Sequence, residues 1–223
     1  MTSPSKPESL WPARLVILAV IGLNLVLSEH LTLGPNWLLP TLEGLLLIPL
    51  VILRGQERRR LLRVGQQEMD WSQGTRLLAF GMIALLHATN LTSLGLLVWS
   101  LLKGSSASGV TLLAGALNIW ATNVLVFSLW YWEMDQGGPL RRGQEGQFPD
   151  FQFPQSLPNP LAPANWRPEY LDYLFIAFTN AAAFSPTDAM PLTRRAKALM
   201  TFQAATSMLT VVLVASRAVN ILK

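Results

Sequence analysis

Long apolar blocks separated by short polar segments dominate the chain, and this pattern predicts membrane-spanning helices. The long blocks lie at residues 13–27, 37–53, 76–102, 110–132 and 196–222. A further block, Glu169–Phe184, has 16 residues. As a helix it would reach about 24 Å, which is less than the ~30 Å hydrocarbon core of a bilayer. We therefore predict an all-α polytopic transmembrane helix bundle with five full spans plus one short or re-entrant helix.

The polar segments between the blocks divide the chain into four regions. Residues 1–12 form a polar tail that we expect to be disordered, and 13–132 form a four-helix membrane region with a basic cytoplasmic loop at 54–75. The segment 133–168 holds seven of the 15 prolines and too many aromatic and apolar side chains for a solvated linker. We expect it to be an ordered cytoplasmic strap on the helix ends. Residues 169–223 supply the short helix, a polar corner and the last span.

Composition supports a membrane location and indicates its orientation. Charged residues make up 13% of the 223 residues, against about 25% in a typical soluble domain. The net charge of +4 comes largely from arginines in loops between apolar blocks, a pattern typical of cytoplasmic loops rather than of a nucleic-acid-binding face. We expect the N-terminus and the strap to lie in the cytoplasm, with the lipid bilayer as partner and no nucleic acid bound.

The sequence leaves open the path of the short block Glu169–Phe184. If it crosses the membrane, the basic cluster Arg194–Lys197 lies outside. If it re-enters from the cytoplasm, that cluster lies inside and the C-terminus moves out. The distribution of basic residues does not separate the two arrangements, and we favour the crossing.

Two ionisable side chains, Glu43 and His87, are expected at membrane depth, where a charge is costly. Glu43 lies 11 residues before Arg54, and His87 lies 11 residues after Arg76. Both therefore sit roughly 16 Å deep on antiparallel helices. We expect them to meet, either as a structural hydrogen bond or as a proton-responsive pair at a transport site; the remaining alternative is that they face different neighbours.

One face of the last span carries polar side chains. They recur at spacings of 3, 4, 7 and 3, as Gln203, Thr206, Thr210, Arg217 and Asn220. Such a face turns to protein or to a water path and not to lipid. The expected partners on the third and fourth spans are Asn90, Asn118, Thr122 and Asn123. These contacts either hold the helices together or line a cavity.

A polar corner joins the short helix to the last span. Ser185-Pro186-Thr187-Asp188 has the pattern of a helix start, with a hydroxyl cap, proline at the first position and a carboxylate three residues after the cap. Together with Asn180, the side chains of Ser185, Thr187 and Asp188 either cap and pack the helix ends or form a vestibule for a ligand or ion.

Motifs of catalysis are missing from the sequence. The chain has no cysteine, its two histidines are far apart, and neither HExxH nor GxSxG occurs. We therefore expect no enzyme activity, no metal site and no cofactor.

Several segments together resemble a family of uncharacterised bacterial multi-pass membrane proteins. The segments are 122–139, 149–155, 170–200 and 216–222. Within them, Asp172–Thr179 is similar to a D-x-L-Y-F-x-F-T helix, Thr187-Asp188 to a T/S-D turn, and Arg194–Lys197 to a basic start of the last helix. The resemblance covers roughly residues 76–222. It implies an integral inner-membrane protein and implies no activity.

The same part of the chain distantly resembles the pore module of two-helix potassium channels. The shared order is an outer helix, an aromatic pore helix, a threonine, a polar turn and an inner helix. A potassium filter uses a T-V-G-Y-G type loop, whereas Thr179 is followed here by Asn-Ala-Ala-Ala-Phe, without glycine. Potassium selectivity is therefore not implied. In such channels the outer helix also ends outside, which conflicts with a cytoplasmic location for the arginine-rich loop 54–63.

We expect the protein to move a small solute or ion through the membrane, using Glu43, His87 and the polar face from Gln203 to Arg217. The alternative is a structural or partner-binding membrane protein whose strap docks a membrane partner or a second copy of the chain. A water-lined path past Glu43 or His87 would favour transport. A tightly packed interior with an exposed apolar patch on the strap would favour the alternative.

Overall fold

The computed structural model describes residues 8–65, 72–103, 108–143, 146–158, 163, 166–184 and 188–221, with side chains up to residue 216. Within these residues the chain forms an all-α bundle, as predicted. The α-helices are α1 (Trp11–Val26), α2 (Leu38–Val64), α3 (Gln73–Lys103), α4 (Gly109–Met134), α5 (Tyr170–Ala183) and α6 (Arg194–Ile221). The short elements are the 3₁₀ turns η1 (Glu29–Leu31), η2 (Asp135–Gly137) and η3 (Pro154–Ser156), and the strands β1 (Phe151–Gln152) and β2 (Met190–Pro191).

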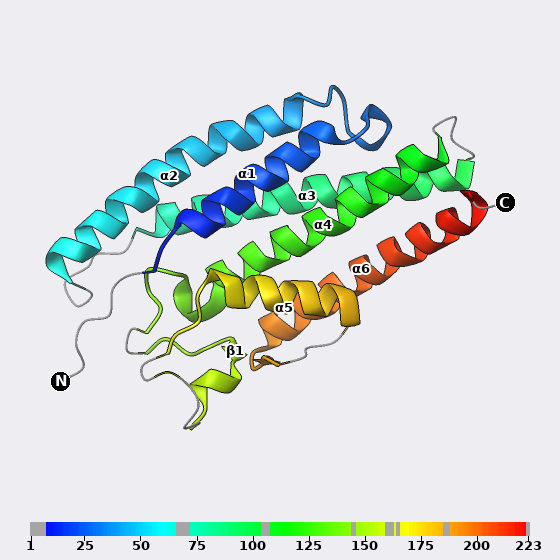
Figure 1. Cartoon of the computed structure of the whole chain (residues 1–223). Coiled ribbons are helices and arrows are strands. Elements are labelled where there is room, and N and C mark those ends of the chain that lie inside the picture. The colour runs from blue at the N-terminus through cyan, green and yellow to red at the C-terminus, as the bar shows by residue number, and fades with distance from the viewer. Residues whose placement is uncertain are drawn as a thin grey trace.

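The long helices run side by side along one axis, with α4 in the middle (Figure 1). α4 packs against α1, α3, α5 and α6, while α2 lies on the outside against α1 and α3. The interior around α4 holds large, fully buried side chains, among them Phe127 and Tyr131. Burial of such aromatic groups stabilises the packing of the other helices around α4.

Four helices of the described chain, α2, α3, α4 and α6, are long and apolar enough to cross a membrane. α1 has 16 residues and is shorter than these. The outer faces expose large apolar side chains, for example Leu45 and Ile48 on α2 and Met208 and Val212 on α6. Apolar side chains gathered on the outside of a bundle fit a lipid environment better than water.

α2 extends beyond the span that the sequence predicts. We expected a polar loop from residue 54, with at most a short interfacial helix at its RRRLLR core, but α2 continues to Val64, and α3 starts at Gln73 instead of Arg76. Arginine, glutamate and leucine favour helix, and Leu61 is buried on the inner side of this extension. Good helix formers, with Glu57 and Leu61 buried, therefore continue the helix into the basic segment.

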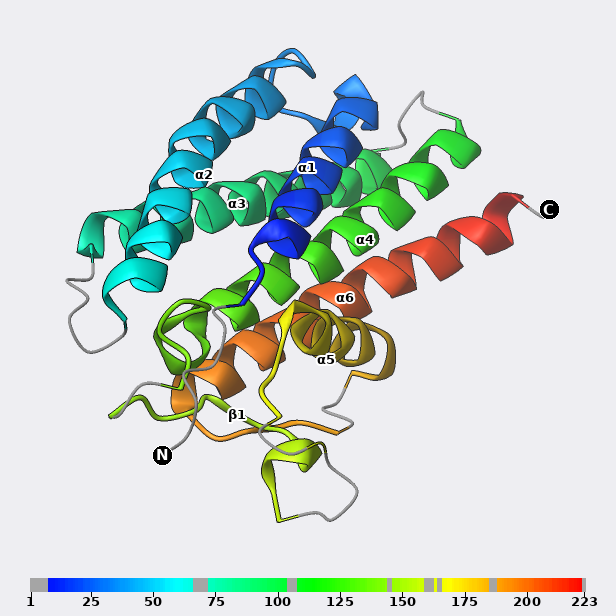
Figure 2. The same cartoon turned by 60° about the vertical axis from the view of Figure 1, so that its left-hand side comes forward.

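α5 enters the bundle from the strap and the chain returns to the same end (Figure 2). β2, just before α6, pairs with β1 of the strap, with Phe151 opposite Pro191 and Gln152 opposite Met190. α5 has 14 residues, or about 21 Å, which is too short to cross. Both flanks of α5 therefore lie at the strap, which is the geometry that a re-entrant helix requires and differs from the crossing that we favoured from the sequence. α6 then carries the C-terminus to the opposite end (Figure 1).

Candidate functional site

A carboxyl group lies completely buried between α1 and α2. Glu43 has 0% of its surface exposed, and Asn24 Nδ2 donates to both carboxylate oxygens, at 3.0 and 3.1 Å. Thr89 on α3 lies beside this carboxyl group, and its hydroxyl donates to the carbonyl oxygen of Leu85 at 3.0 Å. Within the described chain, no arginine, lysine or histidine forms an ion pair with Glu43. Because neutral donors do not cancel a charge, a charged carboxyl group is costly in this environment.

His87, which we expected to meet Glu43, packs against aromatic rings instead. The centre of its ring lies 4.9 Å from that of Phe127 on α4 and 5.6 Å from that of Phe202 on α6. Both Glu43 and His87 are described, and no hydrogen bond or ion pair joins them. Equal depth in the membrane does not determine the direction in which a side chain points around its helix axis. His87 and Thr89 are two residues apart on α3, which corresponds to a rotation of about 200° around that axis. Thr89 therefore faces Glu43, and His87 faces away from it.

Two other predicted site residues do meet, where α4, α5 and α6 join. Asn180 Nδ2 donates to Gln203 Oε1 at 2.8 Å, and Gln203 Nε2 donates to the carbonyl oxygen of Ala177 at 2.8 Å. The hydroxyl of Tyr131 donates to the same Gln203 oxygen at 2.6 Å. Gln203 is completely buried, and these protein groups satisfy its amide. This cluster therefore holds three helices together.

The polar stripe on α6 has only part of its predicted partners. Asn123 Nδ2 donates to Thr206 Oγ1 at 3.3 Å and to Ser207 Oγ at 2.7 Å. Asn118 instead donates to the carbonyl oxygen of Leu23 on α1, at 2.9 Å. Asn118 therefore ties α4 to α1 rather than to α6, because its side chain leaves the opposite side of α4.

The predicted vestibule at the corner is described only in part. Ser185, Thr187 and the side chain of Arg217 lie outside the described residues. Asp188 is exposed, whereas Asn180 is buried and uses its amide within the core cluster. Asn180 and Asp188 thus have different surroundings and do not face one common space.

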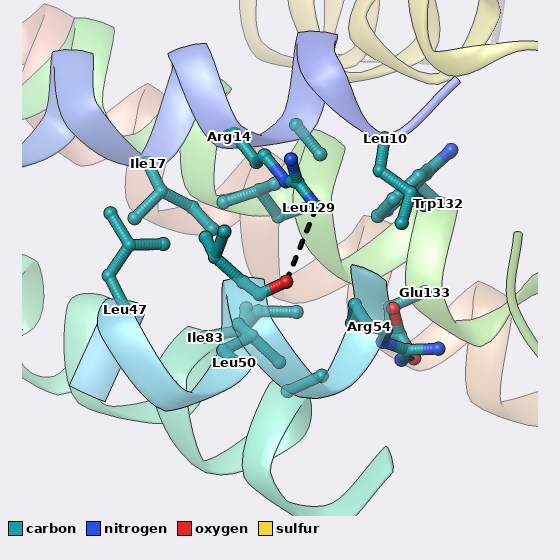
Figure 3. A pocket seen from close by; sticks show the side chains of 13 residues that line it. Leu10, Arg14, Ile17, Leu47, Leu50, Arg54, Ile83, Leu129, Trp132 and Glu133 are labelled. Atoms are coloured by element: carbon teal, nitrogen blue, oxygen red, sulfur yellow. Dashed lines mark hydrogen bonds and ion pairs between the residues drawn. The ribbon is translucent and has the colours of Figure 1, made fainter. Parts of the chain in front are cut away.

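An apolar pocket lies between α1 and α2 toward the strap end of the bundle (Figure 3). Its cavity volume is about 40 Å³, and α3 and α4 form its floor. Arg14 reaches across it from α1, with Nη2 3.4 Å from the carbonyl oxygen of Val51 on α2. At the same end Arg54 of α2 forms an ion pair with Glu133 of α4.

The pocket and Glu43 share one face of α2. Glu43, Leu47, Leu50 and Arg54 are spaced by 4, 3 and 4 residues, which places them along one side of a helix. Leu47, which lines the pocket, is one helical turn from Glu43. We call the contact between α1 and α2 along this face the α1/α2 seam. The pocket occupies its strap end, and Glu43 lies farther along it.

Sequence reasoning missed a charged cluster beneath the strap. Arg142 forms an ion pair with Glu8, and its Nη2 donates to the carbonyl oxygen of Trp132 at 2.7 Å. The guanidinium carbon of Arg142 lies 4.7 Å from the ring centre of Tyr173, whose hydroxyl donates to Asp135 Oδ2 at 2.5 Å. One sequence feature could have located this cluster. The apolar block 110–132 ends in tryptophan and tyrosine, and charged residues follow it directly.

The same cluster anchors the strap to α6 through Asp150, which is completely buried. Its backbone N–H donates to Asp135 Oδ1 at 2.7 Å. Its carboxylate accepts two hydrogen bonds from Arg195, both at 2.7 Å, and a third from the hydroxyl of Thr193. We call this set of contacts the strap latch. It fixes the start of α6 to the segment that precedes α5.

Electrostatics at the N-terminal contact are dominated by burial. Burial raises the pKa of Glu8 to about 7, although the nearby Arg142 guanidinium and the hydrogen bond from Trp132 act to lower it. Trp132 Nε1 donates to Glu8 Oε1 at 2.7 Å. The carboxyl group of Glu8 therefore changes its charge near neutral pH.

Neither metal ligation nor a known relative accounts for these sites. No group of three or more His, Cys, Asp or Glu side chains in the described part of the chain could hold a metal ion. No protein-family model, curated protein or solved structure matches the chain.

Proposed function

We propose that this chain is an integral protein of a bacterial inner membrane that moves a small solute or ion through the bilayer. Five helices, α1 to α4 and α6, cross the membrane, and α5 re-enters from the strap side. The 16 residues of α1 reach about 24 Å, a mismatch that a bilayer accommodates by local thinning. The four long apolar helices α2, α3, α4 and α6 support a membrane location.

The distribution of basic residues supports a cytoplasmic strap and N-terminus. Basic side chains gather at the strap end of the bundle, namely Arg54, Arg58, Arg59, Arg60, Arg63, Arg76, Arg141, Arg142, Arg194, Arg195 and Lys197. The re-entrant path of α5 brings the last three of these to that end. An excess of arginine and lysine is typical of the cytoplasmic side of a membrane protein.

The observation that carries the proposal is the buried carboxyl group of Glu43, which has neutral partners. A carboxylate without a cation is costly within a bilayer, so membrane proteins retain such groups mainly where protons, ions or substrates pass. Glu43 lies about 8 Å along α2 from Leu38 and about 16 Å from Arg54. It therefore stands between the pocket at the strap end and the opposite surface. A solute moving along the α1/α2 seam would pass it.

Sided labelling of a Glu43→Cys variant tests this role. The chain has no native cysteine, so the variant carries a single thiol. We expect a membrane-impermeant thiol reagent to modify it in proteoliposomes when added on either side, because a transport path must expose this position to water from both. Asn24→Cys repeats the test from α1.

The control is Leu86→Cys, a completely buried position on α3, which we expect to stay unlabelled from both sides. Labelling of the Glu43→Cys thiol from neither side would show that the carboxyl is purely structural. Labelling from one side only would indicate a cavity that opens to that side alone, and it would also contradict the transport role.

Partner docking through the strap is the second candidate function. Phe148 is 83% exposed, and Leu157 on the same strap is also exposed. Exposed apolar side chains on an anchored segment fit contact with another membrane protein or with a second copy of the chain. The satisfied polar cluster around Gln203 likewise supports a structural role for that part of the bundle.

A further inference from the structure

The strap end of α2 extends beyond the apolar part of that helix and presents a basic surface. Residues 38–53 are largely apolar, whereas residues 55–64 continue the same helix for about 15 Å. Glu57 and Leu61 are buried against the bundle, but most of the other side chains in this segment are exposed. The segment lies at the outer edge of the bundle (Figure 1). We call residues 55–64 the basic extension.

The arginines of the basic extension have no acidic partner in the part of the chain that the structure describes. Arg54, just before the extension, forms ion pairs with Glu133 and with Glu57, the single acidic residue of the extension. No described Asp or Glu forms an ion pair with the four arginines of the extension, Arg58, Arg59, Arg60 and Arg63. Residues 58–76 together contain five arginines and two acidic residues, a net charge of +3. The surface therefore stays positive whichever pairs form within it.

Apolar side chains lie between these arginines on the exposed surface. Leu62 is 58% exposed and Val64 is 46% exposed. Leu62 follows Arg59 by three residues, and Val64 follows Arg60 by four, so each shares a helix face with an arginine. A helix that combines basic and apolar side chains in this way fits the boundary between lipid headgroups and acyl chains.

Arg76 of α3 and its aromatic neighbours indicate the depth of this region. The guanidinium carbon of Arg76 lies 5.4 Å from the ring centre of Phe80, and that ring stacks on Trp130 of α4 with their centres 5.7 Å apart. Tryptophan is enriched at the headgroup level of membranes. The end of α2 and the start of α3, which are consecutive helices, therefore lie at this level together.

We propose that the basic extension binds the phosphate groups of anionic phospholipids on the cytoplasmic face of the membrane. A guanidinium group can donate two parallel hydrogen bonds to a phosphate, and several arginines next to a spanning helix raise the local concentration of anionic lipid. Leu62 and Val64 favour a lipid surface over a soluble polyanion, which offers no apolar contact. The inference rests on the membrane location in the proposed function, but it does not depend on a transport role for Glu43.

Local quenching of a fluorophore in full-length protein tests the proposal. Gln56 is exposed and lies three residues before Arg59, and the native chain has no cysteine, so Gln56→Cys can carry a single fluorophore beside intact arginines. The labelled protein is reconstituted with nitroxide-bearing phosphatidylglycerol or phosphatidylcholine. We expect phosphatidylglycerol to quench at about fivefold lower membrane fraction or less, because each basic side chain near an anionic surface contributes about this factor. High salt should reduce the difference.

A fluorophore at the opposite end of the bundle provides the positional control. Leu33→Cys lies at an exposed position between α1 and α2, and we expect the two lipids to quench it equally. Equal quenching of the Gln56→Cys fluorophore by both lipids would overturn the proposal while leaving the membrane location intact. Quenching of this fluorophore by neither lipid would show that the extension lies away from the membrane surface, and it would overturn the proposal as well.

Matched charge variants assign the lipid preference to individual arginines. In the Gln56→Cys background, Arg59→Gln with Arg63→Gln should lower the preference for phosphatidylglycerol about fivefold per arginine, and lysine at both positions should retain most of it. Arg194→Gln with Lys197→Gln removes the same charge from two exposed positions at the start of α6, and we expect the preference to persist.

Two results with these proteins would contradict the proposal. Equal loss of preference in both pairs of glutamine variants would mean that overall charge, and not the basic extension, attracts the lipid. Relief of the quenching by micromolar polyglutamate in the presence of excess phosphatidylglycerol would assign the surface to an acidic protein segment and overturn the lipid proposal.

Discussion

At the scale of single residues, buried carboxyl groups have very different surroundings in this molecule. Glu133 faces Arg54 in a direct ion pair, whereas Glu43 has hydrogen bonds from neutral groups. Glu8 pairs with Arg142, and yet its pKa is raised by burial. Desolvation can exceed the attraction of a neighbouring charge when both partners leave water. Charge at each site is thus decided by local hydration as well as by the nearest cation.

Glu8 gives the protein a stability that depends on pH. Its pKa rises from 4.5 in the unfolded chain to about 7 in the folded protein. Between these values the folded protein holds a proton that the unfolded chain has released, so the free energy of unfolding falls as pH rises through this window. The loss is at most ~3.5 kcal/mol, at ~1.4 kcal/mol per pKa unit. We expect a lower Tm at about pH 7.5 than at about pH 5 in detergent.

Glu8→Gln is the control for this dependence. Glutamine keeps an oxygen that can accept the hydrogen bond from Trp132 but does not titrate, so we expect a smaller Tm change over the same pH range. A variant with the same pH slope as the native protein would contradict the assignment. A native protein that became more stable with rising pH would contradict its sign.

At the scale of elements, the return of the chain to the strap after α5 depends on contacts at both flanks of this helix. Glu169 N–H donates to Asp172 Oδ2 at 2.7 Å in a capping box that starts the helix. After α5, β2 and the strap latch return the chain to the strap. These contacts hold the chain before and after α5 at the same end of the bundle.

Asp150→Asn should weaken this arrangement, because it removes the charge from a carboxylate that accepts three hydrogen bonds. Bonds to charged groups contribute about 1.5–3 kcal/mol, so we expect the free energy of unfolding to fall by roughly 2–3 kcal/mol, measured as a lower Tm. Arg194→Gln, next to Arg195 and exposed, is the matched control and should change stability by about 0.5 kcal/mol or less. Equal effects of the two substitutions would refute the latch.

At the scale of the whole molecule, the sequence predicted the parts that depend on local pattern. Apolar blocks determine where helices form, so the all-α class and the apolar cores of α2, α3, α4 and α6 could be predicted. The polar stripe correctly brought Asn123 to α6, because spacing along one helix fixes a face. The spacing of Glu43, Leu47, Leu50 and Arg54 likewise places these residues on one face of α2, but it does not identify α1 as their partner.

Other features arise from contacts that no local pattern specifies. The rotation of α3 separates His87 from Glu43, and spacing alone could not show it. Glu8 and Arg142 are 134 positions apart, so their pairing depends on the complete fold. The return of α5 depends on a pair of two-residue strands, β1 and β2, which are too short to give an alternating signal.

The arrangement of the whole molecule in a membrane, with α5 re-entrant, can be tested with three single-cysteine variants. Ser156→Cys lies in the strap, Met190→Cys lies after α5, and His30→Cys lies at the opposite end of α1. All three positions carry exposed side chains. In sealed, oriented vesicles, an impermeant thiol reagent should modify Ser156→Cys and Met190→Cys from the same side and His30→Cys from the other. Modification of Met190→Cys from the side of His30→Cys would mean that α5 crosses, and it would contradict this account.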